Sequence, residues 1–212
     1  MKDIFKQNLN LLVTLFGENP VYSKLDRLKE IFISTESSWT NNIERFRDKP
    51  IKYILLGEAA PWSENGIPRY FYNQIESKFH RSIWNAFFPS FPIPKEGKNS
   101  YEMLANEGFL LIDTLPYAMD YSGKRNKSSY YNLINSSVNW WTRKLQHENL
   151  ILAKDIKVSF AFKINGLTLI DSLDRKLKLK NGNTIILNED LIAADGSGYT
   201  NSQKLRDLYF SV

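Results

Sequence analysis

Short apolar runs separated by helical patterns constrain the fold of this chain more than any other feature. The runs cover residues 51–56, 109–112, 158–162 and 185–187, and stretches with helical periodicity lie between them. Short apolar runs bounded by glycine, proline or polar residues are typical of buried strands. Strands that alternate with helices indicate βαβ units and a parallel sheet. We therefore predict an α/β fold, with three α/β/α layers around a central, mainly parallel four-stranded sheet.

The segment before the first predicted strand is expected to be helical. Apolar side chains recur at helical spacing over residues 4–16 and again over residues 24–33. We assign residues 1–47 as an N-terminal helical part of a single domain that spans residues 1–212. The chain has no cysteine, which excludes a disulfide scaffold, a thiol nucleophile and a thiolate-held iron–sulfur cluster.

Two of the predicted strands end next to an acidic residue. Glu58 follows the run 51–56 and Gly57, and Asp113 follows the run 109–112. In open parallel sheets, ligands bind beyond the carboxyl ends of the strands. We therefore expect Glu58 and Asp113 to line one site at this edge.

Several catalytic and metal-binding motifs are missing. The sequence contains no G-x-S-x-G elbow and no Walker A loop, so an α/β-hydrolase and a P-loop enzyme have no support. His80 and His147 are its only histidines, and neither belongs to a metal-binding pair. We predict that the protein uses no metal and no cofactor.

The chain is moderately basic, with 28 Lys and Arg residues, 23 Asp and Glu residues and a net charge of +5. Lys124, Arg125 and Lys127 cluster in one predicted loop flanked by tyrosines. Such a loop suits contacts with phosphates, so we expect DNA as a partner; the alternative is a solvated loop tip. No apolar run approaches the ~18 residues of a membrane span, and we expect a cytoplasmic monomer.

Three segments resemble motifs of the uracil-DNA glycosylase superfamily. Residues 54–61 read ILLGEAAP and resemble the first motif of the branch that carries Gly-Glu-Ala-Pro-Gly. Residues 107–114 read EGFLLIDT and are similar to the strand whose asparagine reads the base. Residues 192–198 read IAADGSG and lie where the family usually has His-Pro-Ser. The resemblance spans roughly residues 48–210 and implies the same fold.

The resemblance also implies roles for individual residues. Glu58 and Asp195 lie at the catalytic positions, and Glu58 would orient the attacking water. A flipped base would stack on an aromatic side chain, with Phe71 first and Tyr72 second. The base-binding residues would be Gly57, Ala59, Phe71, Tyr72 and Asp113. The DNA-binding residues would be Ser197 and Gly198, with Ser197 close to Glu58 and Asp113, in addition to Lys124, Arg125 and Lys127 of the basic loop, which are predicted from their charge.

Three departures from the family pattern change the expected activity. Ala60 is inserted before Pro61, Asp113 replaces an asparagine, and Asp195 replaces a histidine. A carboxylate only accepts hydrogen bonds, so Asp113 should favour a base with an amino group over uracil. We predict a DNA base glycosylase-like protein with a specificity altered from uracil. The alternatives are a nucleic-acid or nucleotide-binding module without the chemistry, and hydrolysis of a small nucleoside.

Each candidate residue also has a purely structural interpretation. Glu58 could cap a helix or pair with a lysine, and Phe71 could pack in the core. Asp113 could accept hydrogen bonds from loop amides. The segment from Gly196 to Gly198 could form an ordinary turn.

Overall fold

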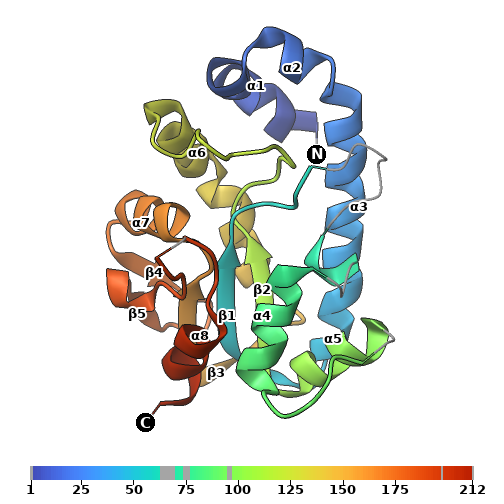
Figure 1. Cartoon of the computed structure of the whole chain (residues 1–212), viewed down its shortest axis with the longest axis vertical. Helices are drawn as coiled ribbons and strands as arrows, with labels where there is room; N and C mark the ends of the chain where they lie inside the picture. Colours follow the sequence, from blue (N-terminus) through green and yellow to red (C-terminus); the bar gives the residue numbers. More distant parts are fainter. Residues whose placement is uncertain (1, 63–69, 74–76, 95–96, 197, 212) are drawn as a thin grey trace.

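A three-stranded parallel sheet forms the centre of the molecule in the computed structural model (Figure 1). The structure describes residues 2–62, 70–73, 77–94, 97–196 and 198–211. The strand order is β2-β1-β3, and the strands are β1 (Pro50–Gly57), β2 (Phe109–Asp113) and β3 (Ile151–Phe160). The predicted α/β class is thereby confirmed.

The four-stranded central sheet is not confirmed. The predicted run 185–187 overlaps β5 (Thr184–Ile186), which pairs antiparallel with β4 (Lys176–Lys178) in a separate ribbon. Ile186 is 61% exposed, whereas an inner parallel strand needs apolar cover on both faces. Within the described residues, the central sheet continues beyond β3 only through a parallel bridge between Phe160 and Ile192.

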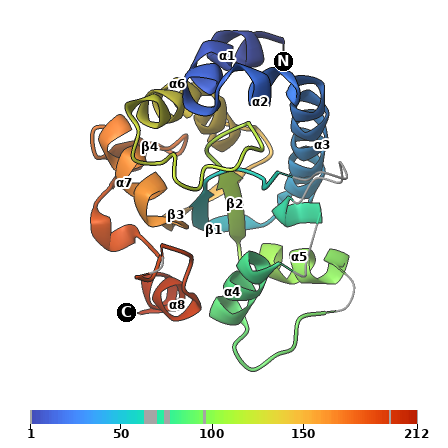
Figure 2. The same cartoon turned by 45° about the horizontal axis from the view of Figure 1, so that its top comes forward.

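Helices cover both faces of the sheet (Figure 2). The first face is covered by α3 (Leu25–Ile43), α6 (Ser128–Leu145) and α7 (Lys163–Ser172), and α1 (Lys2–Phe16) packs on α6. The second face is covered by α4 (Lys78–Phe87), α5 (Gly97–Asn106) and α8 (Ser202–Phe210). The remaining short helices are α2 (Glu18–Tyr22), η1 (Glu44–Phe46), η2 (Phe71–Asn73) and η3 (Glu189–Leu191).

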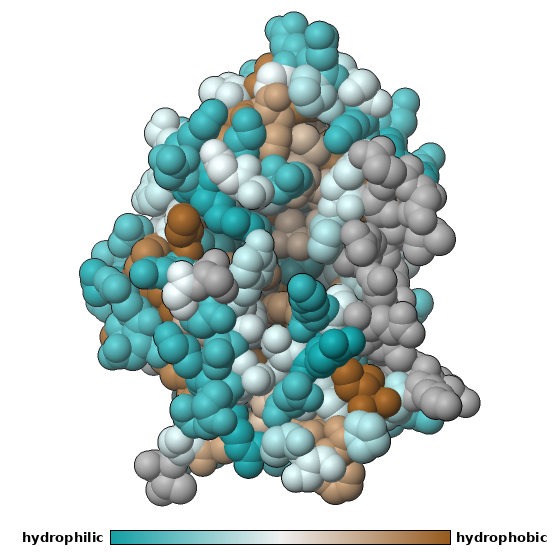
Figure 3. Space-filling view, in the orientation of Figure 1, coloured by the Kyte–Doolittle hydropathy of each residue, from teal (hydrophilic) through white to brown (hydrophobic). Residues whose placement is uncertain are grey.

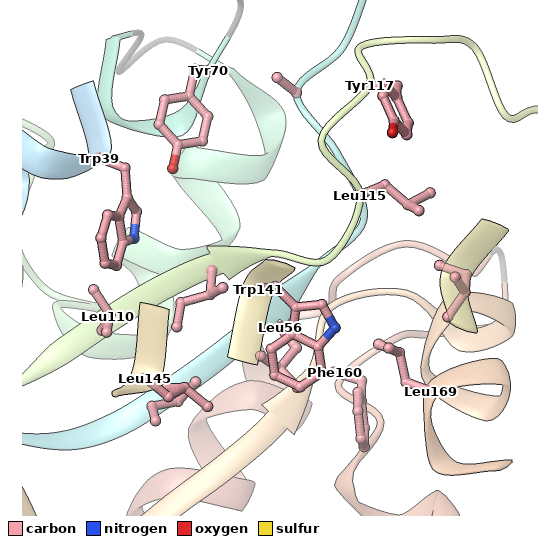
Figure 4. Packing of buried hydrophobic residues seen from close by; sticks show 14 of the residues in the cluster. Trp39, Leu56, Tyr70, Leu110, Leu115, Tyr117, Trp141, Leu145, Phe160 and Leu169 are labelled. Atoms are coloured by element: carbon pink, nitrogen blue, oxygen red, sulfur yellow. The ribbon is translucent and has the colours of Figure 1, made fainter. Parts of the chain in front are cut away.

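Successive strand residues supply the two hydrophobic clusters in turn. Ile54 and Leu56 of β1 pack in the larger cluster, and Leu55 packs in the smaller one. Figure 4 shows part of the larger cluster, in which Trp141 of α6 lies above Leu56. Because side chains alternate across a strand and each fully buried leucine contributes about 1.5–3 kcal/mol, β1 is fixed in its register.

The helix predicted over residues 24–33 is longer than expected. Trp39 and Ile43 continue the apolar stripe of Phe32 at helical spacing, and all three are buried in α3. None of the described helices combines the length and the apolar character that a membrane crossing requires.

Candidate functional site

The carboxyl ends of β1 and β2 bring Glu58 and Asp113 to one edge of the sheet. Gly57 pairs in parallel register with Asp113, and Glu58 follows directly. Glu58 is 6% exposed and Asp113 is 8% exposed, so both carboxyl groups are buried. The surface is hollowed near the centre of the view in Figure 3, over the strand ends seen in Figure 1. The parallel topology therefore gathers two acidic side chains at the edge where such sheets bind ligands.

The Glu58 carboxylate is paired at both of its oxygens. Arg125 donates from Nε to Oε1 at 2.7 Å and from Nη2 to Oε2 at 2.6 Å. Tyr130 Oη donates to Oε1 at 2.6 Å. The hydrogen bond to Glu58 raises the pKa of Arg125, and burial raises the pKa of Tyr130. Both partners therefore keep their protons, and the bidentate pair is of the strong, charge-assisted kind.

A second set of hydrogen bonds holds the Glu58 pair in place. Asn165 Nδ2 donates to Tyr130 Oη and to Thr114 Oγ1, each at 3.3 Å. Thr114 Oγ1 in turn donates to the carbonyl oxygen of Gly57 at 2.7 Å. Glu58 thus pairs with a basic residue, an arginine rather than a lysine, and anchors the basic loop. For Glu58 to activate water, Arg125 would have to leave it.

The Asp113 carboxylate has a different environment. Within the described part of the chain it accepts no hydrogen bond, and burial raises its pKa from 3.8 to about 7. Lys144 lowers this pKa, whereas Glu58 and Glu36 raise it. A Cβ atom at Gly57 would lie 2.5 Å from Asp113 Oδ1. Any larger residue at position 57 would displace this carboxyl group from its observed position.

A small cavity lies beside Asp113, between α3, α6 and the end of β2. Its enclosed part measures about 10 Å³, the space of about one water molecule; with its open mouth the pocket measures about 270 Å³. Its polar lining comes from Thr35, Glu36, Tyr70, Asp113 and Lys144. The Tyr70 hydroxyl points toward the strands in Figure 4. Burial raises the Tyr70 pKa, and no described residue forms a hydrogen bond with its hydroxyl.

Lys144 supplies a fixed positive charge to the cavity wall. Its side chain is 7% exposed, and its Nζ lies 2.5 Å from Glu36 Oε1. The ammonium group also lies 4.9 Å from the Trp39 ring centre and 4.2 Å from the Trp140 ring centre. Burial lowers the Lys144 pKa, and Glu36 and Asp113 oppose that effect. Two indole rings and a carboxylate therefore hold this cation.

The predicted stacking residues Phe71 and Tyr72 do not line the cavity. Phe71 is buried in the smaller hydrophobic cluster, where it contacts Phe109. Tyr72 Oη accepts from the Leu111 amide at 2.8 Å and donates to the Leu111 carbonyl at 3.1 Å. The core interpretation therefore describes Phe71, and Tyr70 is the aromatic residue of this segment that reaches the cavity.

The two alanines of the first motif have different surroundings. Ala59, which we predicted to bind the base, is half-buried against the larger cluster. Ala60, the residue inserted relative to the family pattern, lines the cavity instead.

The loop that contains Asp195 is a tight turn. The Asp195 amide donates to the Tyr199 carbonyl at 2.9 Å, and the Gly198 amide donates to the Asp195 carbonyl at 3.0 Å. Gly198 has a φ of 84°, which favours glycine. The turn thus uses the amide of Gly198, one of the residues predicted to bind DNA. Ser197 lies outside the described residues, so the structure does not place it relative to Glu58 and Asp113.

The three basic residues of the predicted phosphate-binding loop have three different environments. Arg125 turns inward to Glu58. Lys124 is half-buried, with its Nζ 6.0 Å from the ring centre of Phe16. Lys127 is exposed at the N-cap of α6. In this arrangement Lys127 is the member of the trio most open to a phosphate.

Sequence reasoning missed the cavity residues Tyr70, Glu36 and Lys144 and the Glu58 partner Tyr130. Glu36 and Lys144 lie on amphipathic helices, where a charged side chain is usually solvated, and Tyr130 lies on the same helix as Lys144. The signal available for Lys144 was its spacing four residues after Trp140, which places both on one helix face. Among the described residues, no three His, Asp or Glu side chains are grouped to hold a metal ion.

Comparison with known proteins adds no relative to this description. No protein-family model, no curated protein and no solved structure matches the chain.

Proposed function

We propose that this protein binds a DNA base that has left the double helix, and that the edge of the base enters the cavity at Asp113. One observation carries the proposal. Asp113 is a buried carboxylate that faces a cavity and has no hydrogen-bond donor among the described residues. Buried polar groups in folded proteins nearly always have partners. A ligand that brings a donor would supply the missing one.

The surroundings of the cavity support a base bound to DNA. An enclosed space of about 10 Å³ behind a wider mouth has room for one polar atom of a base, in place of one water molecule, while the rest of the ring lies in the mouth. Lys127 offers an exposed cation at the start of α6, and the chain carries a net charge of +5. Phosphate contacts of this kind position a protein on DNA, and base contacts give the specificity.

Hydrolysis of the glycosidic bond is a second candidate, which the position of Glu58 favours. Its carboxylate lies at the same sheet edge as Asp113 and raises the pKa of that residue. If Arg125 moves to a phosphate when DNA binds, Glu58 becomes available to orient water. In an active protein, Glu58→Gln should then lower the cleavage rate by about 100-fold, the lower end of general-base effects.

The experiment is a panel of labelled duplexes that carry one test base opposite an abasic site, which makes the base easy to extrude. Binding is measured by fluorescence anisotropy, and cleavage by alkali-labile strand breaks. We expect cytosine, adenine or guanine to bind at least about 10-fold more tightly than uracil, from one hydrogen bond to a charged group. Asp113→Asn should shift the preference toward uracil. Asp155→Asn, on the exposed part of β3, is the matched control.

The results separate the two candidates. Tight binding without strand breaks supports the binding module, and strand breaks that depend on Glu58 support the glycosylase. If no test base binds more tightly than a duplex with an abasic site in its place, the proposed function is wrong.

A further inference from the structure

We propose that Lys144 is a second base-reading residue, and that the cavity selects a base edge carrying both an exocyclic amino group and a carbonyl oxygen. Cytosine and guanine have such an edge. This inference rests on the proposed function, because it assigns the base class to the same cavity. Asp113 would accept from the amino group, and Lys144 would donate to the carbonyl oxygen.

The two charged residues face one cavity from different elements. Asp113 ends β2, and Lys144 lies in the last turn of α6. Their exposures of 8% and 7% leave little contact with solvent except through the cavity. A carboxylate only accepts hydrogen bonds and an ammonium group only donates them. A ligand edge that satisfies both must therefore offer one donor and one acceptor.

Three side chains contact the Lys144 ammonium group at the cavity wall. The Trp39 and Trp140 rings flank its ammonium group, and Glu36 accepts one of its hydrogen bonds. An ammonium group has three N–H donors, so other donors remain for a ligand. A carbonyl oxygen at the place of one water molecule would accept from them.

The third polar group of the cavity suits both bases. Tyr70 contributes a hydroxyl that forms no hydrogen bond with any described residue. A hydroxyl both donates and accepts. It can donate to the ring N3 of cytosine or accept from the N1–H of guanine, the atom between the amino and carbonyl groups in each case.

The remaining bases each leave one group of the cavity unsatisfied. Adenine has its acceptor in the ring, at N1 directly beside the amino group, and no carbonyl oxygen at the far end of that edge, so Lys144 would lack the exocyclic acceptor that cytosine and guanine present. Uracil and thymine have carbonyl oxygens but no amino group, and at pH 8, where Asp113 is ionised, a second acceptor beside it would be repelled. A buried polar group without a partner costs about 1–3 kcal/mol, so these bases should bind less tightly.

The test alters the base and leaves the protein unchanged, so it carries no risk to folding; the step from guanine to 2-aminopurine also turns the N1–H donor into an acceptor, which the Tyr70 hydroxyl can meet by donating instead of accepting. Guanine is compared with hypoxanthine, which lacks the amino group, and with 2-aminopurine, which lacks the carbonyl oxygen. Cytosine is compared with 2-pyrimidinone, which lacks the amino group. Each is placed in a duplex opposite an abasic site, and binding is measured by anisotropy. Each deletion should weaken binding about 10- to 100-fold, as expected for hydrogen bonds to charged groups.

A protein variant then assigns the carbonyl contact to Lys144. Lys144→Met keeps the aliphatic stem between the tryptophans but removes the charge, and Lys154→Met at an exposed site on β3 is the control. Lys144→Met should abolish the preference for guanine over 2-aminopurine and leave the preference for 2-aminopurine over purine unchanged. Comparing the affinities for guanine- and cytosine-containing duplexes shows which of the two bases binds more tightly.

Distinct outcomes refute the inference and the proposed function. If the deletions change binding less than 3-fold, or if adenine or uracil binds most tightly, the base class is wrong although a base still binds. If Lys144→Met folds and retains the full preference for guanine over 2-aminopurine, Lys144 is not a reading residue. If no duplex shows base-dependent binding, the proposed function itself fails.

Discussion

Two acidic residues at the same sheet edge have opposite surroundings. Glu58 is satisfied by Arg125 and Tyr130, and a further shell of hydrogen bonds supports those partners. Asp113, at the end of the neighbouring strand, is just as buried but accepts no hydrogen bond from any described residue. A complete network stabilises the folded chain, whereas an incomplete one costs stability. The difference indicates that Glu58 organises the edge, and the ligand contact that we propose for Asp113 would complete the second network.

Helix α6 connects the two regions. Tyr130 lies in its first turn beside Glu58, and Lys144 lies in its last turn beside the cavity. At 1.5 Å per residue these positions are about 20 Å apart along the helix. Tyr130 and Lys144 are therefore too far apart to contact each other, so the two residues can be altered separately although Glu58 and Asp113 lie on adjoining strand ends.

The largest expected effect is the dependence of stability on Asp113 and pH. The folded-state pKa of about 7 exceeds the ordinary 3.8, so the folded protein retains a proton that the unfolded chain has lost. Stability should fall as pH rises from about 4 to about 7 and then level off. Asp113→Asn removes this loss, so above pH 7 it should be more stable than the parent by up to roughly 4 kcal/mol.

Urea unfolding at pH 4, 6 and 8 measures this effect. The two proteins should differ little at pH 4 and most at pH 8, and Asp155→Asn should show no such trend. A stability difference that is constant across the pH range would show that Asp113 is not held in its neutral form.

The opposite result is expected at Glu58. Glu58→Gln leaves the half-buried Arg125 guanidinium without its counter-charge, and breaking buried pairs typically costs several kcal/mol. We expect a loss of about 3 kcal/mol in the free energy of unfolding at pH 7, measured by urea denaturation. If the free energy of unfolding does not change, the Glu58 hydrogen bonds do not stabilise the fold. The contrast between Glu58 and Asp113 would then be wrong.

A Lys144 variant tests whether this lysine influences the pKa of Asp113 across the cavity. Lys144 lowers the Asp113 pKa, whereas Glu58 and Glu36 raise it. Lys144→Met should therefore raise the Asp113 pKa further above its value in the parent, as followed by the pH dependence of unfolding. If the midpoint moves down or stays in place, Lys144 does not act on the carboxyl group across the cavity.

The smallest expected effect concerns the basic loop. Lys127 is exposed and Arg125 is engaged with Glu58. Lys127→Ala should reduce the dependence of log K on log salt by about one unit, the contribution of a single phosphate contact. Lys154→Ala, on the part of β3 away from the carboxyl edge, should leave the slope unchanged. An identical slope in both variants would assign Lys127 to a solvated loop tip.

Much of the fold could be predicted because strand and helix periodicities are local properties. The run that became β2 is buried throughout, and the carboxyl-terminal halves of β1 and β3 are buried apolar segments as well. The predicted place of residues 185–187 in the central sheet is not confirmed, because three apolar residues suit a two-stranded ribbon as well as a central strand. Which strands become neighbours in a sheet depends on contacts between distant segments, and the sequence of one segment does not contain that information.

The candidate site could be predicted only in part. The parallel arrangement of strands places Glu58 and Asp113 at one edge, and their sequence positions contain that information. The partner of Glu58 lies 67 residues away, and nothing local marks Arg125 as buried rather than solvated. Likewise, the aromatic cage of Lys144 combines α3 and α6, whose packing fixes it only in the folded chain.

The titration of Asp113 in the free and the DNA-bound protein tests most directly whether this carboxyl group is the ligand contact. Its side-chain carboxyl carbon can be followed by NMR across pH 4 to 9, with Asp113→Asn to assign the signal. We expect a pKa near 7 in the free protein and a lower pKa with a cytosine- or guanine-containing duplex bound, because donors stabilise the ionised form. A pKa near 4 in the free protein, or no change at saturating DNA, would contradict the assignment of Asp113 as the base-reading residue.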